Sequence, residues 1–337
     1  MNSNQAYIHR NYSGIFSTDL TLREWMEAWA PRRASGMDSH SANQILGRVR
    51  RVLILIGDTP LQALTLDIIQ NCIQKLLGQG ITVRPIHTAF AFVNQACEDA
   101  VLRHFLAFNP CAYMRLPKYK RIHRKGLSDT EYRSFIEACA QSPYGLFFRV
   151  MTSAALRFGE VQALTWRQVN FMRKTFIIDQ QITIRDNEDG KPRYTLVPYA
   201  KYGKKQTIHP SVEIFDLLAD EKENQQADCR LHNRIWDESS YIFKKADRHS
   251  FRTEANAEFH AIMDLIGCSD LRPHDLRHTG ARLKFKETGD LWAVRDLLRH
   301  TRLSTTIEYL YSTAEDMQED INKLDEWYRQ FLSPVNF

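Results

Sequence analysis

The segment HDLRHTGARL, which begins at His274, places two histidines and two arginines within ten residues. His274 and His278 have the i, i+4 spacing of a helical metal-binding pair. His274 and Arg277 have the i, i+3 spacing that puts an imidazole and a guanidinium on one face of a helix, where together they can hold an anion. Leu276 and Gly280 lie roughly on the opposite face and are expected to be buried. Two kinds of site, a metal site and an anion site, are therefore open.

The metal interpretation is the weaker of the two. The zinc-protease pattern H-E-x-x-H requires a glutamate where this chain has Asp275, and no third ligand is evident. The cysteines form no CxxC pair, which is typical of reduced thiols and not of a zinc knuckle or a disulfide framework. These scattered cysteines are Cys72, Cys97, Cys111, Cys139, Cys229 and Cys268. We therefore expect no metal ligands.

Three further segments carry reactive or cationic side chains. In SAALRFGEVQALTW, Arg157 stands in apolar surroundings and Glu160 can neutralise it, as in an ordinary ion pair. In YAKYGKKQTIHP, Lys201 lies at a glycine turn between strands, where a solvated hairpin tip is the simpler interpretation. In LLRHTRLSTTIEYLY, His300 precedes Tyr309 by nine residues. Each segment alone is ordinary, and only the set is informative.

Taken in order, the set resembles the signature of the tyrosine recombinase, or phage integrase, family. The family pattern has arginine in GLR-x-x-E-x-x-L-x-W, lysine in a β-hairpin, HDLRHT, LGH, and STT-x-x-Y. The chain has ALRFGEVQALTW, AKYGKKQTIHP, HDLRHT, LRH and STTIEY. The resemblance covers residues 126–312. The run LQALTLDI, upstream, is similar to a segment of the family's helical core-binding domain.

The resemblance implies a nucleophile and two proton carriers. Tyr309 would attack a DNA phosphate, leaving a 3′-phosphotyrosyl bond and a free 5′-hydroxyl, so that the energy of the broken bond is conserved. Lys201 would be the general acid that protonates the departing 5′-oxygen. His274 would help to remove the tyrosine proton, a role that suits imidazole near neutral pH.

The resemblance also implies a cationic pocket for the phosphate. Arg157 and Arg277 would hold the nonbridging oxygens, because a guanidinium stays charged and binds two oxygens at once. His300 would add a donor, and Glu160 would support Arg157. No metal or nucleotide cofactor is implied.

Four positions depart from the family pattern or compete with it. Arg299 replaces the glycine of LGH and is expected to alter the turn that brings in the next residue. Gln168 replaces an aspartate and is expected to matter for packing. Tyr311 is a second tyrosine close by. The nucleophile is expected to be Tyr309, because Tyr309 is the tyrosine of the STT-x-x-Y pattern. Lys204 is the alternative to the assigned lysine.

The 337 residues exceed what one core usually serves, so two domains are expected. The cap signals include Thr65 and a capping box at Ser128 and Glu131, while the stretch 175–208 has β-type runs. The predicted fold is mainly α with a small antiparallel β-sheet: a helical domain plus a mixed α+β catalytic domain, which the resemblance implies form a C-shaped DNA clamp. The segments are an N-terminal extension 1–17, a helical core-binding (SAM-like) domain 18–112, a basic linker 113–125, a catalytic domain 126–312 and a C-terminal helical tail 313–337.

Charge is uneven along the chain, although the net charge is only +5. The run KYKRIHRK can follow DNA phosphates or be an ordinary solvated surface. The tail has one apolar helical face, which either packs on the chain's own core or docks on a neighbouring copy. The basic residues of the run, expected to bind DNA, are Lys118, Lys120, Arg121, Arg124 and Lys125.

The sequence thus predicts a site-specific DNA recombinase of the integrase type, acting in integration or excision of a mobile element. A catalytically inactive DNA-binding protein of the same fold and a type IB topoisomerase-like enzyme are the alternatives. The expected partners are double-stranded DNA, three further copies in a homotetramer on synapsed DNA, and DNA-bending or directionality proteins. Without an apolar run of membrane-span length or a signal peptide, we expect a cytoplasmic, nucleoid-associated protein.

Overall fold

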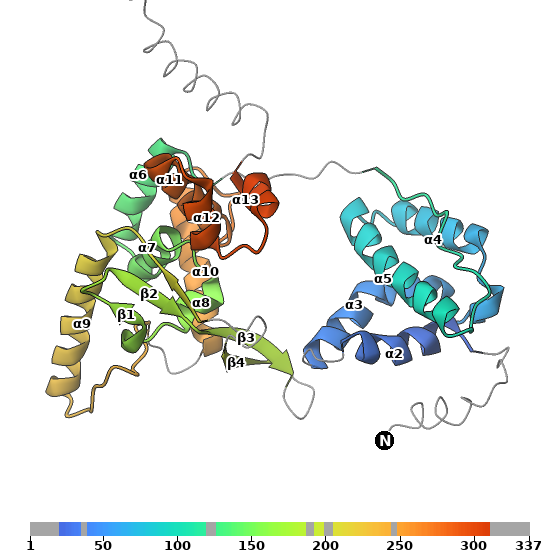
Figure 1. The fold of residues 1–337 in the computed structure, drawn as a ribbon, viewed down its shortest axis with the longest axis horizontal. Coiled ribbons are helices and arrows are strands. Elements are labelled where there is room, and N and C mark those ends of the chain that lie inside the picture. Colours follow the sequence, from blue (N-terminus) through green and yellow to red (C-terminus); the bar gives the residue numbers. More distant parts are fainter. Residues whose placement is uncertain are drawn as a thin grey trace, which may run out of the picture. The chain divides into compact units, whose positions relative to one another are not determined.

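The structure, a computed structural model, describes residues 20–34, 39–118, 126–186, 192–198, 205–243 and 248–310. These residues form two compact units with separate hydrophobic cores (Figure 1). Helices dominate both units, and the strands are short and antiparallel, so the predicted fold class is confirmed. The predicted N-terminal extension, most of the basic linker and the C-terminal tail lie outside the described residues.

The first unit is helical. In its first helix the apolar side chains at i, i+3, i+4 and i+7 spacing predict a buried stripe, and Leu22, Trp25, Met26 and Trp29 are buried. The indole Nε1 of Trp25 donates to the carbonyl of Ala96 at 2.8 Å, which ties the first helix of this unit to its last. Thr65 caps its helix by accepting from the N–H of Ile68. The elements are α2 (Leu22–Arg33), α3 (Ser39–Ile56), the 3-10 turn η1 (Leu61–Ala63), α4 (Leu66–Gly78) and α5 (Val83–Leu102).

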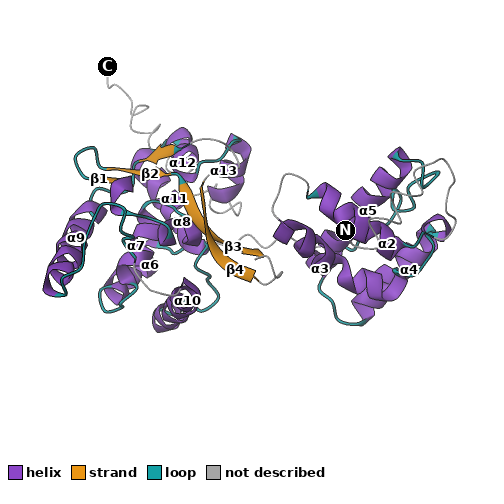
Figure 2. Ribbon diagram, turned by 90° about the horizontal axis from the view of Figure 1, so that it is seen from below, coloured by secondary structure: helices purple, strands orange, loops and turns teal. Residues whose placement is uncertain are grey.

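The second unit carries most of the helices around a small amount of strand, which Figure 2 shows in orange. The predicted capping box at Ser128 and Glu131 is present at the start of its first helix. No helix in the described part of the chain is both long and apolar enough to cross a membrane. The helices are α6 (Asp129–Cys139), α7 (Gly145–Ser153), α8 (Phe158–Gln162), the turn η2 (Trp166–Gln168), α9 (Ile214–Leu231), α10 (Arg248–Leu265), α11 (Asp275–Thr288), α12 (Leu291–Leu298) and α13 (Leu303–Leu310).

The β region differs in detail from the single small sheet that was predicted. One sheet has the order β1-β2-β5 and the other pairs β3 with β4. In the first sheet Phe176 lies opposite both Val169 and Ile208, so its buried ring sits at the centre of the three strands. The strands are β1 (Val169–Asn170), β2 (Thr175–Ile178), β3 (Gln180–Asp186), β4 (Pro192–Pro198) and β5 (Gln206–Ile208).

An aromatic cluster fixes α8, the helix that follows Arg157. The ring of Phe147 on α7 lies 4.7 Å from that of Phe158, and 5.1 and 5.2 Å from those of Phe243 and Phe251. Tilted and edge-on contacts of this kind add to the hydrophobic gain from burying the rings. The cluster therefore holds the start of α8 against α7 and α10.

Close backbone contact places α11 against α7. A Cβ atom added at Gly280 would stand 1.9 Å from the carbonyl oxygen of Thr152, so only glycine fits there. One residue earlier, the buried hydroxyl of Thr279 accepts from the N–H of Leu127 at 2.9 Å. Both contacts hold the helix that carries Arg277 in one position.

Gly280→Ala should therefore destabilise the second unit. We expect the free energy of unfolding to fall by about 1–3 kcal/mol, because α11 and α7 must separate to admit the methyl group. Urea titration followed by circular dichroism measures this change. Gly78→Ala is the control, because a Cβ added there meets nothing within 4 Å. Equal stability of the Gly280→Ala protein and the wild type would contradict the close contact.

Candidate active site

Arg157 lies at the start of α8, where Glu160 holds it. The carboxylate of Glu160 accepts from the backbone N–H of Arg157 at 2.8 Å and from its Nη1 at 2.9 Å. The glutamate side chain is fully buried, whereas that of Arg157 is 44% exposed. The predicted ion pair is present, and it leaves much of the guanidinium at the surface.

Arg277 points inward, whereas its spacing from His274 was expected to present both side chains on one face of the helix to an anion. Arg277 is 1% exposed, and its Nη1 donates to the carbonyl of Ala155 at 2.5 Å. Its Nη2 donates to the carbonyl of Leu298. The side chain thus joins the turn before Arg157 to the end of α12.

His274 is the N-cap residue of α11, not a residue of the helix interior. It lies at the surface, but its neighbours remove part of its hydration, and this lowers its pKa from the ordinary value of 6.5. The positive charges of Arg277 and Arg157 lower the pKa further. The imidazole is therefore neutral at physiological pH.

His300 follows a tight turn at the end of α12. Its backbone N–H donates to the carbonyl of Arg295 at 3.1 Å, and its Nδ1 lies 3.1 Å from the hydroxyl oxygen of the buried Thr306. Burial lowers the pKa of His300 to about 4, and nearby positive charges contribute. Those charges belong to Arg277, Arg157, Arg299 and His278.

The structure therefore brings five of the predicted site residues together. Two bonds link Arg157 to Glu160, and the same two arginines act electrostatically on both histidines. These five come from α8, α11 and the turn after α12, segments that are far apart in the sequence. They are Arg157, Glu160, His274, Arg277 and His300.

The remaining predicted residues lie partly or wholly outside the described residues. The backbone of Tyr309 lies in α13, which packs against α11 and α12, but its side chain lies outside what the structure describes. Lys201 and Lys204 fall between β4 and β5, outside the described residues, as does Tyr311. In the predicted linker Lys118 is exposed, and Lys120, Arg121, Arg124 and Lys125 lie outside the described residues.

The two histidines that suggested a metal site lie with their rings edge to face, 5.9 Å apart. Within the described ranges, no group of three or more histidine, cysteine, aspartate or glutamate residues is placed to hold a metal ion.

Gln168 explains one departure from the family pattern. Its side chain is buried, and its Oε1 accepts from the N–H of Thr165 at 2.7 Å. Its Nε2 donates to the carboxylate of Asp179. An ionised aspartate has no such donor, so the amide here lets the carboxylate of Asp179, the residue between β2 and β3, pair with this turn.

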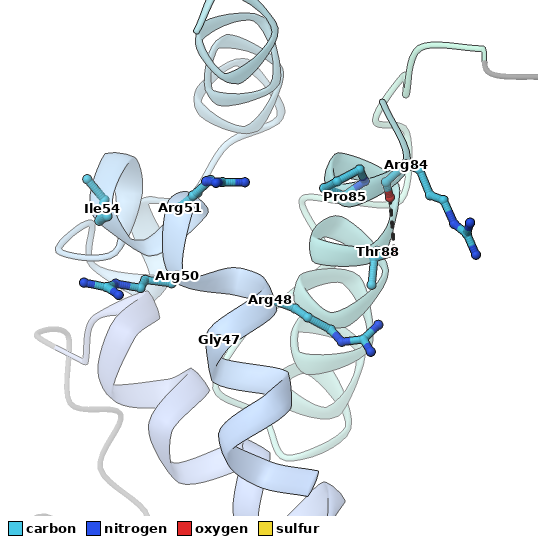
Figure 3. Close-up of a pocket in the computed structure, with 8 residues that line it drawn as sticks. All are labelled: Gly47, Arg48, Arg50, Arg51, Ile54, Arg84, Pro85 and Thr88. Carbon is cyan, nitrogen blue, oxygen red and sulfur yellow. Dashed lines mark hydrogen bonds between the residues drawn. The ribbon is translucent and has the colours of Figure 1, made fainter. Parts of the chain in front are cut away.

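A second basic site lies in the first unit, and the sequence analysis missed it. A hollow of about 730 Å³ is lined by four arginines on α3 and the first turn of α5 (Figure 3). All four are exposed, and none has an acidic partner within ion-pair distance among the described residues. The cluster GRVRR was a usable signal, whereas the contribution of α5 depends on the fold. The four are Arg48, Arg50, Arg51 and Arg84.

Comparison with known proteins gives matches across most of the chain. Residues 125–316 match the family model described as the phage integrase family. The ICEBs1 integrase of Bacillus subtilis (strain 168) is 21% identical over 259 residues, which are 75% of this chain and 68% of that protein. Tyrosine recombinase XerC of Histophilus somni (strain 2336) is 22% identical over 266 residues, covering 78% and 82%.

Two solved structures illustrate the fold similarity. The Tn1549 transposon integrase in complex with transposon right end DNA has a TM-score of 0.71 at 14% identity, and the match covers 91% of this chain and 100% of that one. A lambda integrase tetramer bound to a Holliday junction has a TM-score of 0.59 at 18% identity, covering 89% and 80%. At these identities the likeness concerns the fold.

The low pKa of His300 predicts a stability that falls with acidification. An unfolded histidine binds its proton near pH 6.5, whereas folded His300 binds it near pH 4, so the unfolded state gains protons first. The free energy of unfolding should therefore decrease as the pH drops from 6.5 toward 4. His300→Asn should flatten this decrease, as denaturant titrations between pH 5 and 8 would show. Above pH 7.5 the two proteins should differ by a constant, and equal slopes below it would refute the assignment.

Proposed function

The chain belongs to the phage integrase family, and from this membership we propose how it recombines DNA as a tyrosine recombinase. It cuts one strand at a specific site, holds the end on Tyr309, and rejoins it to a strand of a second duplex. One observation carries the proposal: Arg157, Arg277, His274 and His300 converge from separate segments beside α13, the helix that bears Tyr309. The relatives named as integrases of mobile elements favour integration or excision as the biological task.

In the cleavage step one bond forms, one bond breaks and two protons are transferred. The phenolic oxygen of Tyr309 forms a bond to phosphorus while the bond from phosphorus to the 5′-oxygen breaks. His274 assists the loss of the phenol proton, and its depressed pKa keeps the ring neutral and able to accept it. Lys201 gives a proton to the 5′-oxygen. Rejoining reverses these transfers with a new 5′-hydroxyl.

The cations stabilise the charge that builds on the nonbridging oxygens during both transesterifications. Arg157 presents a guanidinium that is 44% exposed next to a buried carboxylate, so it can reach a phosphate without leaving its partner. Arg277 acts from a more buried position, anchored on two carbonyls. These hydrogen bonds hold both arginines, so little reorganisation should accompany the reaction.

His300 contributes a neutral donor. With a pKa of about 4, the ring carries one proton at physiological pH. If the hydroxyl of Thr306 donates to Nδ1, that proton resides on Nε2, which is then the atom that faces a phosphate oxygen. Thr306 is the last residue of the STT segment, so this hydrogen bond gives a physical role to that part of the family pattern.

The first unit supplies affinity for DNA. Its exposed, unneutralised arginine hollow suits the phosphate backbone, since each cation placed on a phosphate releases a condensed counterion. The linker residues Lys118 to Lys125 extend the same interaction.

Recombination between two duplexes also requires several copies of the chain on the DNA. A related integrase forms a tetramer on a Holliday junction, and we propose a homotetramer of this chain on synapsed DNA. The C-terminal tail, with its apolar helical face, is the segment proposed to dock on a neighbouring copy. DNA-bending or directionality proteins complete the complex at the nucleoid, where the substrate lies.

The covalent intermediate gives the primary test. The wild-type chain should form a protein–DNA adduct on a nicked suicide duplex. The short fragment that carries the free 5′-hydroxyl dissociates after cleavage, so the strand cannot be rejoined. Tyr309→Phe should form none, since a phenylalanine ring has no nucleophilic oxygen, while Tyr311→Phe should behave as the wild type. Denaturing gel electrophoresis with labelled DNA measures the adduct.

An adduct that persists in Tyr309→Phe and disappears in Tyr311→Phe would move the nucleophile by two residues. Absence of any adduct from the wild type would refute the proposed chemistry. Joining of strands between two duplexes that share the site separates recombination from topoisomerase-like relaxation.

The arginine hollow generates a second prediction. Arg48→Gln with Arg84→Gln should weaken binding to all duplex sequences and reduce the slope of log K against log salt by about 2, one unit for each lost phosphate contact. Fluorescence anisotropy at several salt concentrations measures the slope. Arg230→Gln with Arg234→Gln is the matched control, because it removes the same charge from the surface of the second unit. An unchanged slope in the first variant would show that the hollow does not contact DNA.

A further inference from the structure

Arg299 stands where the family pattern has glycine, and the backbone shows why glycine is usual. It ends α12 with a φ of +57°, in the left-handed region, and its N–H donates back to the carbonyls of Arg295 and Asp296. Glycine adopts this conformation without the steric cost that a Cβ brings. An arginine at this position therefore disfavours the turn that it occupies.

The side chain of Arg299 is buried against Glu160. It is 4% exposed, and its Nη2 donates to Oε2 of the glutamate at 2.5 Å. Its Nε and Nη1 are buried without a hydrogen-bond partner among the described residues. Buried donors that lack an acceptor oppose folding. Stability alone therefore gives a poor reason for this arginine.

The shared carboxylate connects Arg299 to Arg157. Oε2 of Glu160 accepts both from Arg299 and from the backbone N–H of Arg157, while Oε1 accepts from Nη1 of Arg157. Two guanidiniums thus share one buried carboxylate, so the three groups together carry a charge of +1. With Glu160 and Arg157 alone, the sum would be zero. Arg157 is the exposed member of this group.

We propose that Arg299 is a positioning residue for the cleavage reaction, acting through Glu160. It holds and orients the carboxylate and adds a positive charge beside it, so that Arg157 keeps its place for the phosphate. The inference rests on the proposed function, because it takes the scissile phosphate as the anion that Arg157 binds. Nη2 of Arg299 already donates to Glu160, so the proposal assigns the phosphate to the exposed Arg157 and gives Arg299 no contact with DNA.

The test is the single-turnover cleavage rate of the full chain at saturating suicide substrate. Arg299→Gly should cleave about 10- to 100-fold more slowly, because a misplaced or neutralised Arg157 stabilises the phosphate less well. DNA affinity, measured separately, should change far less than the rate. Arg299→Lys keeps a charge on the same turn and should recover most of the rate. The control is Arg295→Ala, which removes a cation of the same helix that pairs with Asp296 instead, and it should cleave as the wild type does.

Glu160 provides the test that a purely structural role would not pass. In a Glu160→Gln background the carboxylate to be shared is gone, so adding Arg299→Gly should slow cleavage little further. The double variant also removes both buried charges together, which keeps it folded if the single glycine variant is unstable. Additive losses in the double variant would overturn the proposal, as would an Arg299→Gly rate equal to that of the wild type.

The adduct assay on the wild type keeps the two proposals apart. A wild-type chain that forms no adduct overturns the recombination chemistry and this inference with it. A wild-type chain that forms the adduct, together with an Arg299→Gly chain that forms it equally fast, overturns the inference alone. Arg299→Lys that is as slow as Arg299→Gly would overturn the sharing of charge.

Discussion

A buried guanidinium organises the site. Arg277 is 1% exposed and donates to the carbonyls of Ala155 and Leu298, which belong to two separate turns. Both turns contain a non-glycine residue at positive φ, Ala155 itself at +45° and Arg299 at +57°. Each such residue costs about 1–2 kcal/mol in the left-handed region. Charge-assisted hydrogen bonds from one arginine to both turns offset that cost, and they fix the segments that carry Arg157 and His300 relative to each other.

Burial and positive charge together decide the protonation state of the histidines. Burial lowers the pKa of His300 to about 4, and three nearby guanidiniums contribute to the shift. A fourth permanent cation at this position would add repulsion without a compensating anion, whereas a neutral imidazole supplies a donor and no charge. The mixture of arginines and histidines is thus a consequence of packing several donors around one small anion.

Sequence reasoning recovered whatever depends on local chemistry. The cap at Thr65, the capping box at Ser128 and the buried stripe of the first helix all follow from spacing within one turn or two. The division of the strands into two sheets did not follow, because pairing across long separations leaves little trace in alternation. The arginine hollow was missed for the same reason, since Arg48 and Arg84 meet only after α3 packs on α5. The resemblance named five residues that the structure brings together, and their catalytic roles stay a proposal; it did not foresee that Arg277 is buried.

The departures from the family pattern are informative because each exchanges one partner for another. Gln168 replaces a carboxylate with an amide, and Asp179, between β2 and β3, then supplies the carboxylate. Arg299 replaces glycine, and its ion pair with Glu160 offsets part of the free-energy cost of its left-handed backbone conformation. In both cases the new side chain donates to a neighbouring acid, so the change alters charge and hydrogen bonding. Such exchanges are compatible with retained catalysis, because the phosphate senses the position and net charge of the donors and not the identity of the residues behind them.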